Sequence, residues 1–124
     1  MSVLLLAIGG AAGAICRYHL ERFVQARTRR AFPLGIWLIN LSGSLLLGLL
    51  GGLLLHHAEW PGEALRLLLG VGFCGAYTTF SSFALEISQL WRIGQRRAAL
   101  LDLLSQPLLG GLAAWIGLWL GSRL

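Results

Sequence analysis

The sequence predicts an all-α membrane protein in which four helices cross the bilayer and the third is broken in its middle. Of its 124 residues 56% are hydrophobic and only 12% are charged, which leaves too little charge to cover a soluble domain. Four segments carry almost no charge, and each approaches the roughly 20 apolar residues that a spanning helix needs. They are Ser2–Cys16, Leu34–Leu55, Leu67–Leu85 and Leu103–Ser122, and with their flanks they predict one domain, 1–124, with spans at about 2–25, 34–55, 65–90 and 98–121.

The first span contains small residues and closes with an arginine. Gly9 and Gly13 are four residues apart and form a groove for another helix. Arg17 and Tyr18 follow and are expected to end the span near the membrane interface. Arg17 has two interpretations: a side chain that snorkels to the interface, or a residue at the mouth of a pore that raises the local concentration of anions.

The second span carries a polar stripe. Pro33 is a residue typical of helix starts, and Leu34–Leu55 would rise roughly 33 Å as a helix, enough to cross the bilayer. Asn40, Ser44 and Gly48 fall at positions i, i+4 and i+8 and therefore share one face. That face is not expected to meet lipid, so Asn40 either joins helices by hydrogen bonds or offers an N–H donor to an anion.

The third span does not have the pattern of one plain helix. Gly72 and Gly75 give its backbone freedom, and hydroxyls crowd the positions that follow, at Thr78, Thr79, Ser81 and Ser82. We expect the break over Gly72–Thr78, with helix resuming over Thr79–Glu86. Non-helical backbone at membrane depth is tolerated only inside protein or beside an aqueous path, so a break predicts an ion or substrate site. Its unpaired carbonyls are suited to a cation such as sodium.

Two phenylalanines follow the predicted break. Phe80 and Phe83 are three residues apart and project to the same side of a helix, beside a stripe formed by Thr79, Ser82 and Glu86. Such pairs commonly pack in a core or against lipid. Here the neighbouring hydroxyls favour a second interpretation, because the positive edge of a phenyl ring can meet an anion.

The fourth span has few polar residues. Asp102 lies near its start and is expected at the interface, and Ser105 and Gln106 are the only other polar residues before its far end. Pro107 is expected to bend or loosen the helix because it lacks a backbone N–H.

These segments together resemble a known family, the small fluoride channels called Fluc or CrcB. The motifs that carry the resemblance are Gly9–Tyr18, Pro33–Gly35, Asn40–Ser44 and above all Gly75–Phe83 with Glu86. The resemblance covers nearly the whole chain. It implies a dual-topology dimer of antiparallel four-helix subunits, with two fluoride pores and a sodium ion buried on the two-fold axis.

The resemblance also implies roles for individual residues. The backbone carbonyls of Gly75 and Thr78 would be the sodium ligands. The residues expected along the fluoride path are Arg17, Asn40, Thr79, Phe80, Ser82, Phe83 and Ser105. The chain departs from the family at Ile36, where many members carry threonine, and at Leu109, where no second hydroxyl follows Ser105 by one turn.

The expected function is passive release of fluoride. Fluoride is small and strongly hydrated, so its path must replace water with several donors without binding too tightly for exit. The sequence has no nucleotide-binding motif, and flow down the ion's own gradient is simpler than driven exchange. Such a channel would lower cytoplasmic fluoride and its toxicity, in the inner membrane of a bacterium, without enzymatic activity.

The arginines are distributed unevenly between the linkers. Every basic side chain other than histidine is arginine, and eight of the ten lie in the first and third linkers, counted from Arg17 and Glu86. The positive-inside rule then predicts that both termini face outward. An antiparallel homodimer needs both orientations, so a partner chain of opposite bias is the alternative. The net charge of +5 is attributed to topology and anionic lipid and not to nucleic acid.

Two other functional classes remain open at this stage. A small four-helix exporter of drugs or cations would need a carboxylate deep in the first span, and Ser2–Cys16 has none. A structural membrane subunit would explain the small residues but not the hydroxyls around Phe80 and Phe83.

Overall fold

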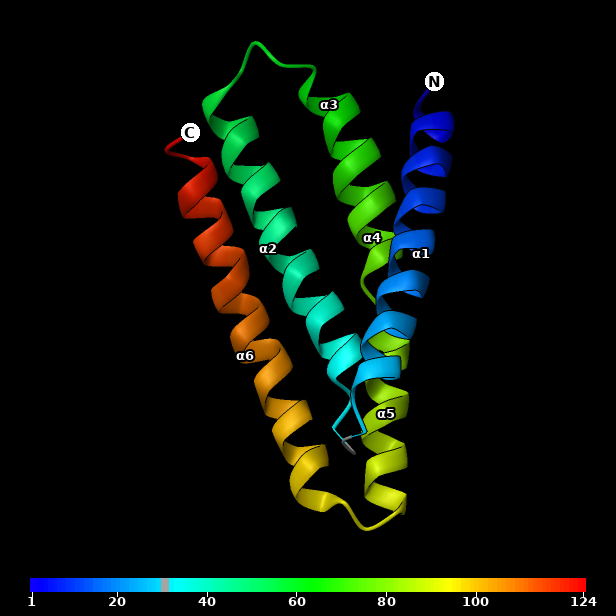
Figure 1. Ribbon diagram of the computed structural model, residues 1–124. Helices are drawn as coiled ribbons and strands as arrows, with labels where there is room; N and C mark the ends of the chain where they lie inside the picture. Colours follow the sequence, from blue (N-terminus) through cyan, green and yellow to red (C-terminus); the bar gives the residue numbers. More distant parts are fainter. Residues whose placement is uncertain (30–31) are drawn as a thin grey trace.

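The computed structural model describes residues 1–29 and 32–124, and they form an all-helical bundle (Figure 1). Three spans are single helices: α1 (Ser2–Arg27), α2 (Leu34–His56) and α6 (Arg96–Gly121). The third consists of α3 (Gly62–Leu65), the π-helix η1 (Arg66–Cys74), α4 (Gly75–Tyr77) and α5 (Phe80–Arg92). Within the described residues these four spans are long and apolar enough to cross a membrane. This arrangement confirms the predicted fold class at the level of one chain.

The four spans associate as two close pairs. In Figure 1, α1 lies beside η1 and α4, and α2 and α6 run parallel to each other. The two termini lie at the same end of the bundle, and the turn between α5 and α6 lies at the other. Gly94 sits in that turn with φ of 82°, a left-handed conformation that residues with a Cβ rarely adopt.

Glycines explain why each pair is so close. A Cβ at Gly9 would overlap the carbonyl oxygen of Leu68, and one at Gly13 would overlap that of Phe73. The predicted groove on the first span is therefore confirmed, and η1 fills it. On the other pair, a Cβ at Gly117 of α6 would overlap the backbone of α2. Small residues allow helix backbones to approach in this way within membranes.

The break in the third span is two residues long. Thr78 has φ −80° and ψ 159°, and Thr79 has φ −150° and ψ 124°, so both are extended while helix ends at Tyr77 and resumes at Phe80. The prediction that the break covers Gly72–Thr78 was wrong. Gly75, with φ −63° and ψ −37°, is helical. The extended residues are instead threonines, whose branched side chains favour extended backbone.

Of the two glycines expected at the break, Gly72 serves packing. Gly72 lies in η1, and a Cβ there would lie 3.1 Å from the Cα of Gly9. Within this stretch the N–H of Gly75 donates to the carbonyl of Gly70, the i to i−5 pattern of a π-helix. Gly72 therefore brings the third span against α1, and Gly75 remains helical.

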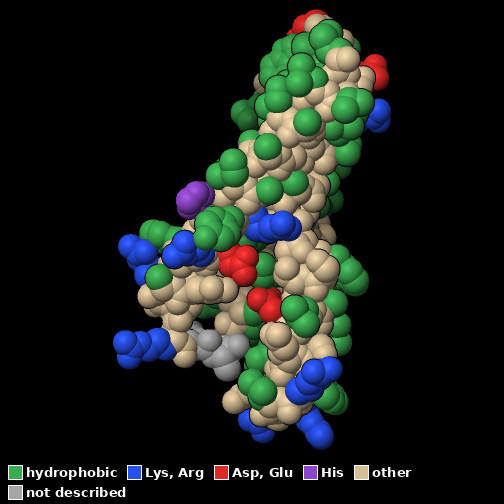
Figure 2. All heavy atoms as spheres, turned by 90° about the vertical axis from the view of Figure 1, so that its right-hand side faces the viewer, with side chains coloured by type: hydrophobic (Ala, Val, Ile, Leu, Met, Phe, Trp, Pro, Cys, Tyr) green, Lys and Arg blue, Asp and Glu red, His purple; other side chains and the backbone are tan. Residues whose placement is uncertain are grey.

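The remaining features position the break. Ile36, Ile39 and Tyr77 form a buried cluster, against which Phe83 packs. Helix α6 continues without interruption through Pro107, so the proline does not divide it. Figure 2 shows one face of the bundle, where hydrophobic side chains cover the upper part and arginines gather lower down.

Candidate functional site

The centre of the site is a pair of hydrogen bonds between Asn40 and the backbone of Thr79. Asn40 Nδ2 donates to the Thr79 carbonyl at 3.0 Å, and the Thr79 N–H donates to Asn40 Oδ1 at 2.9 Å. Thr79 is only 9% exposed. One side chain of α2 therefore supplies both partners that the extended residue lost when it left the helix, and so satisfies a buried backbone that would otherwise be costly.

The break leaves the two predicted sodium ligands outside the helical hydrogen-bond pattern. In a continuous helix the N–H groups of Thr79 and Ser82 would bond the carbonyls of Gly75 and Thr78. Here they donate to Asn40 Oδ1 and Thr79 Oγ1 instead. Carbonyl oxygens freed in this way are suitable ligands for a hard cation, so the donor chemistry at Gly75 and Thr78 fits the sodium that the resemblance implies.

Arg17 lies beside one of these carbonyls, that of Thr78. Its Nη1 is 3.5 Å from the Thr78 carbonyl oxygen, and its side chain is half-buried. Helix α1 continues past Arg17 and Tyr18 to Arg27, in agreement with the predicted span of about 2–25. Arg17 therefore sits next to the middle of the third span, where its charge acts on the break and not on the end of the helix.

A small cavity of about 200 Å³ adjoins the break. It lies between α2 and the first half of the third span and is lined by Asn40, Gly43, Ser44, Leu47, Gly70, Cys74, Gly75 and Thr78. The stripe predicted on the second span is thus placed correctly: Asn40 and Ser44 both face protein. Ser44 Oγ donates to the Asn40 carbonyl at 2.8 Å.

The hydroxyls of the third span gather at the start of α5. Thr79 Oγ1 accepts the N–H of Ser82 at 3.2 Å and caps the helix. The hydroxyls of Ser81 and Ser82 each lie 3.2 Å from Thr79 Oγ1. Three hydroxyls therefore share one short network directly after the break, and each can rotate its proton toward a neighbour or an anion.

The two phenylalanines lie on the same side of α5, as predicted. The ring centroids of Phe80 and Phe83 are 5.7 Å apart, with planes tilted by 55°. Phe83 packs against the core cluster, whereas Phe80 is 79% exposed. The pair therefore leads from the buried centre of the bundle to its surface.

The fourth span meets the site differently from the expectation. Ser105 Oγ accepts Trp37 Nε1 at 2.9 Å, and its neighbour Gln106 is the residue that reaches Asn40, with Oε1 2.7 Å from Asn40 Nδ2. Gln106 Nε2 in turn donates to Asp102 Oδ1 at 2.8 Å. Asp102 is 0% exposed, so its predicted position at the interface was wrong.

Sequence reasoning therefore missed Gln106 and Asp102 as members of the site. The signal was available, because the two are four residues apart and share a face in an otherwise apolar helix. A further missed contact joins Ser42 and Tyr77, whose hydroxyl oxygens are 2.8 Å apart and fix α2 against the residue just before the break.

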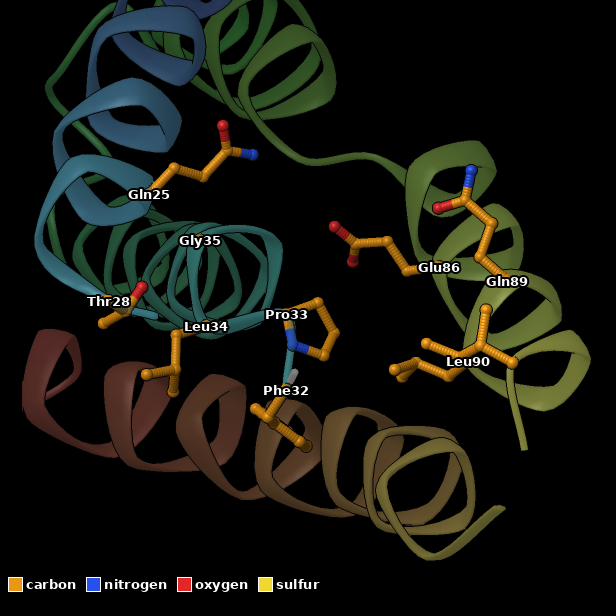
Figure 3. Close-up of a pocket in the computed structure, with 10 residues that line it drawn as sticks. Gln25, Thr28, Phe32, Pro33, Leu34, Gly35, Glu86, Gln89 and Leu90 are labelled. Carbon is orange, nitrogen blue, oxygen red and sulfur yellow. The ribbon is translucent and has the colours of Figure 1, made fainter. Parts of the chain in front are cut away.

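A second pocket contains Glu86. This cavity of about 300 Å³ lies between the end of α1, the start of α2 and α5, and is lined by Gln25, Thr28, Phe32, Pro33, Leu34, Gly35, Glu86, Gln89, Leu90 and Ile93. Glu86 and Gln25 reach into it from opposite sides (Figure 3), and Figure 2 shows acidic side chains in a recess of the surface. Glu86 Oε2 is buried without a hydrogen-bond partner among the described residues.

Comparison with known proteins shows which family the chain resembles. Residues 4–118 match the family described as CrcB-like protein, Camphor Resistance (CrcB). The chain is 43% identical over 122 residues to Fluoride-specific ion channel FluC 1 of Symbiobacterium thermophilum, covering 98% of both chains. It is 46% identical over 121 residues to Fluoride-specific ion channel FluC of Magnetococcus marinus, again with 98% of both covered. It is 36% identical to the Coxiella burnetii protein of that name, over the full length of both.

The broken third span, whose break is held by Asn40 of α2, thus occurs in a chain that matches one family almost from end to end. The protein belongs to the CrcB family.

Proposed function

We propose that this chain forms a fluoride-selective channel, which lets cytoplasmic fluoride flow passively out of the cell and so lowers its toxicity. The observation that carries the proposal is the polar break of the third span. Hydroxyls, an amide and two phenyl rings meet there inside the membrane, in a chain whose relatives are named fluoride-specific ion channels.

The chemistry of the break suits a small anion. Thr79 and Ser82 offer hydroxyl protons, and the Phe80 and Phe83 rings offer positive edges without cationic charge. Several weak donors in sequence can replace the water of fluoride one step at a time, and none binds strongly enough to prevent exit. Arg17 supplies positive potential close by.

The experiment is flux from liposomes loaded with fluoride or with chloride. Purified protein should release fluoride and retain chloride. Phe80→Ile and Phe83→Ile should each slow fluoride release without changing assembly, whereas Trp115→Leu, at a side chain 62% exposed on α6, should not. A folded preparation that releases neither ion, or both equally, would contradict the proposal.

The functional unit in this proposal contains a second subunit in antiparallel orientation. Support comes from one chain alone: Phe80 is 79% exposed, so the path has no wall on that side. A recess of about 580 Å³ with mostly apolar lining also opens between α1 and the break, beside Tyr77 and Phe73. Light scattering in detergent should give twice the chain mass of 13.4 kDa, and a monomer that conducts fluoride would refute this arrangement.

A structural sodium ion belongs to the same proposal. The carbonyls of Gly75 and Thr78 would hold it, and a partner subunit would bring its own pair. A bound sodium ion would neutralise the carbonyl dipoles where chains meet. The assembly should therefore unfold at a higher temperature in sodium chloride than in potassium or choline chloride. Equal unfolding temperatures in the three salts would remove sodium from the proposal.

Orientation decides between a homodimer and a pair of different chains. The arginine excess on one side of the membrane remains when Arg17 is not counted. The other arginines of the first and third linkers still outnumber Arg66 and Arg123. The protein is expected in the bacterial inner membrane with both termini outward. Cysteines placed at the termini of a cysteine-free variant should then be labelled only from outside intact cells. Labelling from both sides would instead support an antiparallel homodimer.

A further inference from the structure

A chain of hydrogen bonds, here called the amide relay, links the break to the buried carboxylate of α6. It consists of Thr79, Asn40, Gln106 and Asp102. The Thr79 N–H donates to Asn40 Oδ1 at 2.9 Å, Asn40 Nδ2 donates to Gln106 Oε1 at 2.7 Å, and Gln106 Nε2 donates to Asp102 Oδ1 at 2.8 Å. Its far end is sealed from solvent, because Gln106 is 6% and Asp102 0% exposed.

The relay has a single direction, which its two ends impose. A backbone N–H can only donate, so it must meet the oxygen of Asn40 and leave the amide nitrogen for other partners. At the other end Asp102 Oδ1 accepts the Gln106 N–H, which turns the Gln106 oxygen toward Asn40. Each amide between these ends therefore has one orientation that satisfies both of its neighbours.

This direction uses both N–H groups of Asn40. One donates to Gln106 Oε1 and the other to the Thr79 carbonyl. Without Asp102, Gln106 could rotate its amide and present N–H groups to Asn40. Two donors would then face each other, and Asn40 would have to turn away from the backbone of Thr79, which would become unpaired.

We propose that Asp102 and Gln106 are positioning residues of the ion path, which fix the orientation of the Asn40 amide and thereby hold the break at Thr79. The proposal adds detail to the proposed channel function. Its flux test rests on that function, because it requires that the protein conducts fluoride. Neither residue needs to touch fluoride. Both act through Asn40, so their effects should vanish when Asn40 is already gone.

The first test is fluoride flux from liposomes. Asp102→Leu and Gln106→Leu should each reduce flux about tenfold, the effect of one strong buried hydrogen bond. Asp102→Asn should retain most of the flux because its oxygen can still accept from Gln106. The matched control is Gln95→Leu, an exposed amide at the start of the same helix. In an Asn40→Leu background, Gln106→Leu should cause no further loss; a full additional loss would overturn the relay.

The second test does not depend on fluoride. Asn40 is the only asparagine in the sequence, so selective ¹⁵N-asparagine labelling gives one side-chain amide pair in an NMR spectrum. In the wild-type protein both protons should be shifted downfield and protected from exchange with water. In Asp102→Leu and Gln106→Leu at least one of the two Asn40 side-chain protons should move upfield and exchange faster with water. In Gln95→Leu both protons should keep their wild-type shift and exchange rate.

The two tests separate the possible failures. If the wild-type protein does not conduct fluoride, the channel function fails, and the NMR signature alone decides whether the relay exists. If the wild type conducts fluoride but Asp102→Leu and Gln106→Leu leave the Asn40 protons unchanged, the relay is refuted and the channel function stands.

Discussion

Replacing Asn40 by aspartate tests how the break is held, because the change preserves the size of the side chain, removes both of its N–H donors and puts an ionisable carboxyl group in their place. Oδ1 remains able to accept the Thr79 N–H. The nitrogen that donates to the Thr79 carbonyl at 3.0 Å and to Gln106 Oε1 at 2.7 Å becomes an oxygen. The new oxygen then faces the Thr79 carbonyl oxygen and Gln106 Oε1. Each pair consists of two acceptors with no proton between them.

The magnitude follows from these two contacts. Leaving a buried acceptor without its donor costs about 1–3 kcal/mol, so two lost donors predict destabilisation of about 2–6 kcal/mol. Thr79 is 9% exposed, and water is poorly placed to replace the bonds. Asn40→Leu should cost a similar amount, because it also leaves the Thr79 N–H unpaired but introduces no repulsion.

The assay is thermal unfolding in detergent, followed by loss of the assembled peak in size-exclusion chromatography, together with fluoride flux at equal protein. Asn40→Asp should unfold several degrees lower than wild type and lose most of its flux. Gln95→Asp, an amide-to-acid change at an exposed position, serves as the control. If Asn40→Asp retained both unfolding temperature and flux, the conclusion that Asn40 holds the break would be refuted.

Three further predictions concern neighbouring features. Gly117→Val should separate α2 from α6 and lower stability by about 1–3 kcal/mol, measured as a fall in unfolding temperature. The control Gly111→Val should leave the unfolding temperature unchanged, because a Cβ at Gly111 meets nothing within 4 Å. Thr79→Ala should remove the cap of α5 and cost about 1 kcal/mol, and Thr79→Ser should restore both stability and flux; failure of serine to do so would argue against the capping role. Arg17→Gln should reduce fluoride flux severalfold at low ionic strength and less at high ionic strength, while Arg123→Gln, at an exposed residue beyond α6, should show no such salt dependence.

The number and order of the helices could be predicted because each span needs a long apolar segment, and the four segments are separated by charged linkers. The position of the break could not. Gly72 and Gly75 suggested flexible backbone, but the structure uses glycine at Gly72 for contact with Gly9. The extended residues are Thr78 and Thr79, which depend on a partner from α2. Local sequence does not reveal a partner 39 positions away.

The site was predictable to a similar extent. The polar stripe of α2 and the shared side of Phe80 and Phe83 follow from helical spacing, which sequence shows directly. Asp102 was placed at the interface because it lies near the edge of an apolar segment. Helix α6 in fact begins at Arg96, so Asp102 is already about 9 Å along the helix. Its contact with Gln106, and that of Gln106 with Asn40, depend on how α2 and α6 align.

The π-helix η1 has a consequence for how the third span can vary. Each of its turns takes in one residue more than an α-turn, so Arg66–Cys74 rotates less about its axis than nine α-helical residues would. The direction in which Thr79 faces is therefore set partly by winding well upstream of it. Substitutions that convert these turns to α-helical turns would rotate the part of the third span that follows η1 away from α2. No residue at the break itself would have changed.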